Sequence, residues 1–207
     1  MSRYLGSACK QCRREKDKLF LKGERCFTAC ALDGKRGKGL PGQHGQKRKK
    51  ESNYAKHLRE KQKARRIYGL TEEQFRHYFE RADRMKGLTG ENLFKLLELR
   101  LDNIVYRMGI ITSRKAARQM VGHGLVLVNE KRINLPGYQV KPGDKISVKE
   151  KMKENVLVKR SLEKGDKFPS WLNFDKTSLI GSVVSDPQAA EFSHPIDSQL
   201  IVELYSK

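Results

Sequence analysis

The stretch LFKLLELRLDNIVYRMG, residues 93–109, decides the fold prediction because apolar side chains recur in it at helical spacing. The recurring apolar residues are Leu93, Leu97, Leu101, Ile104, Val105 and Met108. Arg100 and Arg107 fall on other faces, and Gly109 is a favourable residue for ending a helix. The stretch therefore predicts one main core helix that ends at Gly109.

The residues that follow predict a compact unit of one more helix and small strands. Ser113 can cap a helix over residues 114–121 that keeps its apolar side chains on one face. Beyond it the apolar period changes to two, as is typical of strands. The alternating segments are 125–129, 132–135 and 145–149, with turn residues at 129–130, 136–137 and 142–144.

The regions on either side are less regular. Good helix formers from Ser52 to Tyr68 predict a cationic helix that stops at Gly69. Thr71 can then cap a helix that carries an aromatic stripe. Residues 151–195 predict only a helix over 154–163, and we expect the final segment, 199–205, to pack on protein.

Charge is the strongest functional signal. The 207 residues contain 44 Lys and Arg against 24 Asp and Glu, a formal net charge of +20, which predicts a nucleic-acid partner. Residues 1–66 hold 21 of the basic and 6 of the acidic side chains, so this third carries the electrostatic footprint. An apolar content of 37% predicts one or two small domains with a polar extension and argues against an extensive enzyme core. Without a signal-peptide core or a membrane-length apolar run, we expect a cytoplasmic protein.

A basic run precedes and fills the first predicted helix. Its predicted phosphate contacts are Lys47, Arg48, Lys49, Lys50, Lys56, Arg59, Lys61, Lys63, Arg65 and Arg66. Few acidic residues lie nearby in the sequence, so phosphate contact explains the run better than a helix of internal salt bridges. A flexible solvated tail is the alternative.

A second predicted contact lies at the start of the helix over 114–121. Arg114 and Arg118 are four residues apart, hence on one face, and Lys115 adjoins them near the positive end of the helix dipole. A phosphate there would meet side-chain charge and backbone amides together. An ordinary solvated helix face is the alternative.

The four cysteines form two closely spaced pairs, Cys9 with Cys12 and Cys26 with Cys30. Two chelating pairs at this separation predict one tetrahedral, structural Zn²⁺ site, because four thiolates leave no position for a catalytic water. Two disulfides or four unrelated small residues are the alternatives, and a reducing compartment argues against the disulfides. The sequence Gly37-Lys-Gly-Leu-Pro-Gly42 formally matches a dinucleotide fingerprint, but no strand precedes it, so we set it aside.

Several stretches together resemble the family of bacterial small-subunit ribosomal protein four, in a zinc-binding, four-cysteine form. The matching stretches are Arg3-Tyr-Leu-Gly6, Pro41-Gly-Gln-His-Gly45, Leu58-Arg-Glu-Lys-Gln-Lys-Ala-Arg-Arg-Ile-Tyr-Gly69, Gly90-Glu-Asn-Leu93, Arg100-Leu-Asp-Asn-Ile-Val-Tyr-Arg-Met-Gly109 and Leu200-Ile-Val-Glu-Leu-Tyr-Ser-Lys207. The resemblance implies direct binding to a multi-helix junction in the 5′ domain of 16S ribosomal RNA and nucleation of the subunit body. It also implies contact with ribosomal protein five at an interface that affects decoding accuracy. We also predict RNA contacts for Arg100 and Arg107, which lie in one of these stretches.

These observations predict an α+β protein with no catalytic residues. We expect a basic extension with the zinc site over 1–45, a helical body domain over 46–97 and 161–207, and an inserted RNA-binding module over 98–160. An RNA-modifying enzyme or tRNA ligase is the main alternative, but the chain shows no nucleotide-binding loop and no convincing acid, base or nucleophile set. A zinc-dependent DNA-binding regulator is another alternative, and it lacks a dimerisation element and a clear recognition helix.

Overall fold

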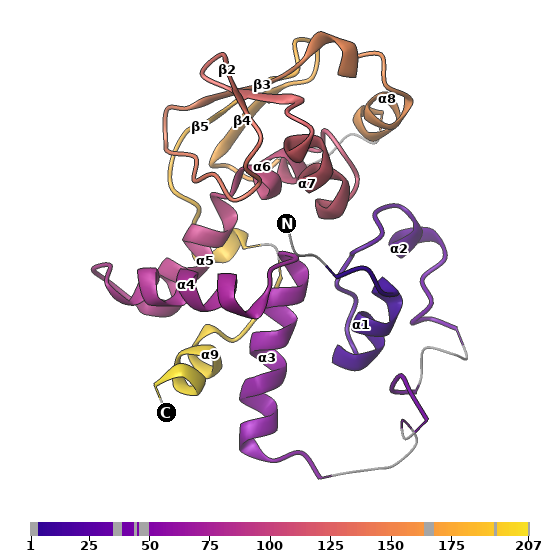
Figure 1. Cartoon of the computed structure of the whole chain (residues 1–207), viewed down its shortest axis with the longest axis vertical. Helices are drawn as coiled ribbons and strands as arrows, with labels where there is room; N and C mark the ends of the chain where they lie inside the picture. The colour runs from indigo at the N-terminus through magenta and orange to yellow at the C-terminus, as the bar shows by residue number, and fades with distance from the viewer. Residues whose placement is uncertain are drawn as a thin grey trace. The chain divides into compact units, whose positions relative to one another are not determined.

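The structure, a computed structural model, describes residues 4–34, 39–43, 45, 50–163, 168–192 and 194–206. The chain forms two compact units (Figure 1). Unit 1 comprises residues 1–92 and 194–207, and unit 2 comprises residues 93–193. Helices form unit 1, and unit 2 adds a small antiparallel sheet, so the predicted α+β class is confirmed.

Unit 1 is built on helices whose ends follow the capping residues of the sequence. Its helices are α1 (Ala8–Glu15), α2 (Arg25–Thr28), α3 (Asn53–Ile67), α4 (Glu72–Asp83), the first part of α5 (Thr89–Glu98) and α9 (Ser198–Tyr205). The Ser52 hydroxyl accepts a hydrogen bond from the Ala55 amide at 3.2 Å and starts α3. Thr71 forms a capping box with Gln74 at the start of α4. Gly69, with φ of 65°, ends α3 in the left-handed conformation that glycine adopts without strain. These predicted helices are confirmed.

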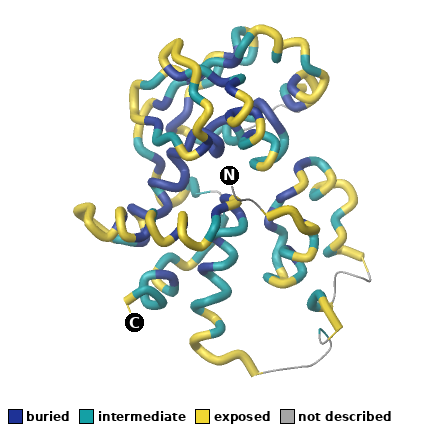
Figure 2. Tube along the Cα trace, viewed as in Figure 1, coloured by how far each residue is buried: buried dark blue, intermediate teal, exposed yellow. Residues whose placement is uncertain are grey.

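The C-terminal helix α9 completes the core of unit 1 by packing along α3. Its Tyr205 ring stacks on Phe75 and Phe79 of α4, with ring centres 6.4 and 4.4 Å apart. Ile201 of α9 and Ala64 of α3 are fully buried. Figure 2 shows α3 passing from exposed at its start to buried at its end. The expectation that the C-terminal segment packs on protein is therefore confirmed.

The predicted single core helix over 93–109 is wrong in one respect, because it is two helices, α5 and α6 (Leu101–Arg107). Arg100 between them is extended, with φ of −72° and ψ of 137°. The backbone there pairs with residues 136–140: the Leu101 amide donates to the Tyr138 carbonyl at 2.9 Å, and the Val140 amide donates to the Leu99 carbonyl at 3.0 Å. These bonds satisfy backbone groups that a continuous helix would use internally, and no local pattern reveals them.

Unit 2 packs helices α6 and α7 (Arg114–Gly122) on one face of a five-stranded sheet (Figure 1). The strands are β1 (Val126–Val128), β2 (Lys131–Ile133), β3 (Lys145–Val148), β4 (Leu172–Asp175) and β5 (Ile180–Val183), in the order β2-β1-β3-β5-β4 and all antiparallel. The predicted turn at Asn129 and Glu130 is confirmed, since both residues have positive φ, 47° and 65°, as a two-residue hairpin turn requires. Helix α8 (Val156–Leu162) and the 3₁₀ helices η2 (Glu150–Met152) and η3 (Ala189–Glu191) complete the unit.

Strands β4 and β5 are the main departure from the predicted organisation. The prediction assigns residues 161–207 to the body domain, but β5 pairs with β3, so residues 168–192 belong to the core of unit 2. Trp171, which precedes β4, is fully buried in that core together with Ile146 and Met108. The pairing joins segments more than 30 residues apart, and the short strands carry no strong alternation of their own.

Within the described ranges, no helix combines the length and the apolar character that crossing a membrane requires.

Candidate nucleic-acid interface

Helix α3 presents a row of cations, and several of them are held by acidic residues of other elements in unit 1. Glu15 of α1 contacts Arg66 and also Arg59, whose Nη1 lies 3.2 Å from its carboxylate. Lys63 Nζ lies 2.7 Å from Asp17. The sequence offers few acidic residues near this helix, but the structure pairs three of its cations with acidic residues that lie 44 to 51 positions away in the sequence.

A further acidic residue pairs with the cations on the other side of α3. Glu72 of α4 contacts Lys61 and lies 3.6 Å from Arg65 Nε. Lys61 is 8% exposed, and its ammonium lies 5.6 Å from the centre of the Tyr205 ring. The contacts of Lys61 thus link α3 to α4 and α9. Its burial is contrary to a direct phosphate contact.

The carboxyl pKa values of Glu15 and Asp17 are shifted in opposite directions. Burial raises the pKa of the Glu15 carboxyl, against the lowering effect of Arg66 and Arg59. Burial alone would also raise the pKa of Asp17, but the hydrogen bond and charge of Lys63 outweigh it and lower that pKa. These contacts join α1 and the residues that follow it to α3, so Arg59, Lys63 and Arg66 are each paired with an acidic side chain.

Other predicted contacts of this region are exposed. Lys56 projects from the exposed first half of α3, and Lys50 is exposed just before it. Lys47, Arg48 and Lys49 lie outside the described residues. The exposed cations thus gather towards the N-terminal end of α3.

In unit 2, two of the predicted arginines are paired with acidic side chains of the same unit, and only Arg100 is buried. Arg100 is 3% exposed and makes a bidentate pair with Asp102, from Nε at 3.0 Å and Nη2 at 2.7 Å. Arg107 Nε lies 3.2 Å from the carboxylate of Glu98, and Arg107 also donates to the Glu191 carbonyl. The burial of Arg100 is contrary to its predicted direct RNA contact, whereas the Arg107 side chain is paired with Glu98 but stays partly exposed. Sequence periodicity placed both off the apolar face but could not show that the opposite face is covered.

The cations of α7 reach the surface beside this buried network. Ser113 caps the helix by accepting from the Ala116 amide at 3.3 Å, as predicted. Lys115 is exposed, whereas Arg114 and Arg118 are half-buried along the edge of α6. Arg114 Nε donates to Asn103 Oδ1 at 2.8 Å, and Arg118 Nη1 lies 3.3 Å from Asp102 Oδ2. The structure thus brings these three cations together at the first turns of α7.

The buried polar residues behind them, Glu98, Asp102 and Asn103, were absent from the sequence-based site. Glu98 is fully buried and accepts from Asn103 Nδ2 at 2.7 Å. A signal did exist, because polar residues enclosed by leucines in ELRLDN need buried partners.

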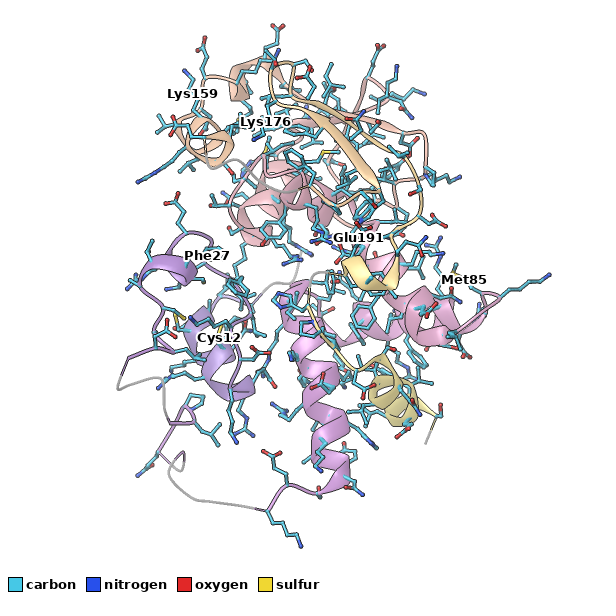
Figure 3. The ribbon with its side chains drawn as sticks, turned by 180° about the vertical axis from the view of Figure 1, so that it is seen from behind. Cys12, Phe27, Met85, Lys159, Lys176 and Glu191 are labelled. Atoms are coloured by element: carbon cyan, nitrogen blue, oxygen red, sulfur yellow. The ribbon has the colours of Figure 1, made fainter. Side chains whose placement is uncertain are left out.

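The four cysteines line one cavity in unit 1, between α1 and α2. Cys9 and Cys12 lie on α1, Cys26 lies on α2, and Cys30 follows it. Figure 3 shows sulfur atoms near the labelled Cys12. Burial raises the pKa of the Cys12 thiol, and the charges of Cys26, Cys9 and Cys30 act on that pKa in the same direction.

The chemistry of this cavity fits a tetrathiolate metal site. The Lys22 amide donates to Cys26 Sγ at 3.3 Å, and the Leu32 amide donates to Cys30 Sγ at 3.5 Å. Lys22 and Arg25 also line the cavity, and their cations would offset the negative charge that four thiolates leave after binding Zn²⁺. In the described part of the chain, no three His, Cys, Asp or Glu side chains are at the mutual spacing of a formed metal centre.

The fold and charge together define a basic α+β protein with cations gathered at the start of α7. Residues 3–98 match the family model described as the ribosomal protein S4/S9 N-terminal domain, and residues 99–146 match the S4 domain. The chain is 64% identical, over the full length of both proteins, to small ribosomal subunit protein uS4 of Endomicrobium trichonymphae. It is 53% identical, again over full length, to uS4 of Natranaerobius thermophilus and to uS4A of Clostridium novyi.

The chain belongs to the uS4 family of small ribosomal subunit proteins. This is a family of ribosomal structural proteins and not of enzymes, in agreement with the sequence-based prediction. The enzyme alternative is therefore set aside.

Proposed function

We propose that this protein is a structural constituent of the small ribosomal subunit that binds 16S ribosomal RNA directly at a multi-helix junction. Through this binding it nucleates assembly of the subunit body. It also contacts ribosomal protein five, and that interface contributes to translational accuracy.

The full-length similarity to uS4 proteins is the observation that carries this proposal. The α7 edge of unit 2 supports it physically, since Arg114, Lys115 and Arg118 gather on a rigid scaffold. RNA helices have a major groove too narrow for side chains, so a rigid cationic surface that reads shape and backbone suits a folded junction. The exposed cations Lys50 and Lys56 of unit 1 would add electrostatic attraction to the phosphate backbone of the RNA.

Filter binding tests this function. We expect the full-length protein to prefer a 5′-domain transcript of 16S ribosomal RNA over a plain duplex of equal length, and to co-sediment with small subunits after a high-salt wash. Equal affinity for the two RNAs would contradict junction recognition. For the partner proposal, purified protein five should bind the assembled protein–RNA complex, and absence of any such binding would contradict that part.

We also infer that Cys9, Cys12, Cys26 and Cys30 bind one structural Zn²⁺. Their common cavity, the two N–H···S bonds and the nearby cations Lys22 and Arg25 support this proposal. When bound, zinc would cross-link α1 to the α2 segment. Because α1 also carries Glu15, the metal would stabilise the surface that packs on α3.

Metal removal tests the zinc site. Metal binding and local folding share one free energy, about 10 kcal/mol or more for such sites, so chelation should selectively expose residues 1–45 to protease. Metal analysis should give one zinc per chain, and substituting Cys26 by Ser should lower that content. Pure protein without zinc, or an unchanged N-terminal cleavage pattern after chelation, would refute the site.

A further inference from the structure

The two half-buried arginines of α7 are each tied to a different, adjacent residue of α6. Arg118 reaches Asp102 at 3.3 Å, and Arg114 reaches Asn103 at 2.8 Å. Arg114 and Arg118 are one helical turn apart on α7, so two neighbouring side chains of α6 fix two cations along one edge. The guanidinium of Arg114 also lies 4.3 Å from the centre of the Tyr106 ring, which restricts its plane.

Both α6 residues are themselves immobilised. The Asp102 carboxylate is 5% exposed and is held from its other side by the bidentate Arg100. Asn103 is 1% exposed, and its Nδ2 donates to the Glu98 carboxylate at 2.7 Å and to the Glu98 carbonyl at 3.0 Å. The chain of contacts therefore runs from fully buried groups to the two arginines at the edge of α7.

An arginine held in this way has already given up most of its rotamer freedom. On binding, each flexible side chain that becomes immobilised weakens affinity by about 2- to 10-fold relative to one that is already fixed. A guanidinium has five N–H donors in a rigid fork, so a bond to α6 is compatible with a simultaneous phosphate contact.

We propose that Asp102 and Asn103 are positioning residues that hold Arg118 and Arg114 in the orientation and spacing needed to bind RNA phosphates. This inference rests on the proposed RNA-binding function of the α7 edge. Asp102 increases RNA affinity although its own charge repels RNA. Asn103 fixes the orientation of Arg114 because Asn103 is itself held by the buried Glu98.

The sign of one substitution separates this proposal from simple electrostatics. Asp102→Asn in the full-length protein adds one unit of positive charge, so charge alone predicts tighter binding to a 5′-domain transcript of 16S ribosomal RNA. Positioning predicts weaker binding, by about 2- to 10-fold. Glu154→Gln adds the same charge at an exposed position of unit 2 and should leave affinity equal or slightly increased.

A double-mutant cycle tests whether Asp102 acts through Arg118. We expect Asp102→Asn to have no further effect on affinity in an Arg118→Ala background, and Asn103→Ala to have none in an Arg114→Ala background. Fluorescence of the single tryptophan, Trp171, which is buried in unit 2, reports that each variant is folded. If Asp102→Asn does not fold, Asp102→Glu keeps the charge while displacing the carboxylate, and it should weaken binding in the same background-dependent way.

The outcomes separate the two levels of the proposal. Loss of affinity that is equal with and without Arg118 would show a general structural effect and overturn the positioning role. Tighter binding of Asp102→Asn would overturn it as well. If Arg118→Ala binds like wild type, the α7 interface itself fails and the positioning role with it, whereas absence of junction preference in the wild-type protein refutes the proposed function.

Discussion

Asp102 shows how a single buried residue of this protein serves two neighbours at once. Its carboxylate lies between Arg100, which is buried, and Arg118, which reaches the edge of α7. Removing one partner of such a pair usually leaves an uncompensated buried charge, which is strongly destabilising. Here the second arginine remains, so loss of Arg118 is tolerated better than loss of Asp102.

For the same group of residues, we predict that replacing Arg114 and Arg118 together by Ala weakens RNA binding while unit 2 stays folded. Removing the bonds to Asn103 and Asp102 should destabilise unit 2 by about 1 to 3 kcal/mol, measured by urea unfolding through Trp171 fluorescence. The slope of log affinity against log salt should become shallower by about one for each phosphate that the variant no longer neutralises. Wild-type affinity in a folded double mutant would place the RNA-binding surface elsewhere.

Among the elements, β5 has the largest effect on the organisation of the chain. It brings residues 168–192 into the sheet of unit 2 by pairing with β3 on one side and β4 on the other. Gly181 lies at the centre of this strand, where an added Cβ would come within 2.5 Å of Met108 Cε and 3.0 Å of the Asn173 carbonyl oxygen. The absence of a side chain there lets the strand approach helix α6 closely.

We therefore predict that Gly181→Ala destabilises unit 2 by about 1 to 3 kcal/mol through overpacking. Ser182→Ala, on the next residue and the opposite face of the sheet, should change the stability by no more than about 0.5 kcal/mol. Urea unfolding followed through Trp171 measures both variants. Equal stability of the two would mean that the Met108 side chain moves aside and that the added methyl group does not overpack this site.

Over the whole molecule, charge and rigidity are distributed differently along the sequence. Residues 1–66 carry a net charge of +15, whereas unit 2 supplies a core with buried polar residues at its edge. Affinity from phosphate neutralisation and selection by shape therefore depend on different parts of the chain.

Deleting residues 1–45 should accordingly reduce salt-dependent affinity but keep the preference for the RNA junction. The deletion removes 11 cations and 4 acidic residues, so the slope of log affinity against log salt should become shallower. The change is partly offset because the removal of Glu15 and Asp17 releases Arg59, Arg66 and Lys63 on α3. Filter binding at several salt concentrations with junction and duplex RNA measures both quantities, and a loss of selectivity with an unchanged slope would reverse these roles.

Features that depend on neighbouring residues could be predicted from the amino-acid sequence alone. The helix caps Thr71 and Ser113, and the turn at Asn129, follow from local hydrogen bonding and backbone preference, which depend on only a few consecutive residues. Net charge and the family motifs likewise depend on composition and order alone.

Tertiary packing, and not the local sequence pattern, decides which polar residues are buried and which distant segments pair. The break at Arg100 and the addition of β4 and β5 to the sheet come from backbone bonds to distant segments. Lys61 is buried in contact with Glu72 and Tyr205 of other helices, and the backbone of the buried Arg100 pairs with Gln139. Hydrophobic periodicity reports which face of an element is apolar, but whether the polar face meets solvent or an oppositely charged side chain depends on what the rest of the chain places there.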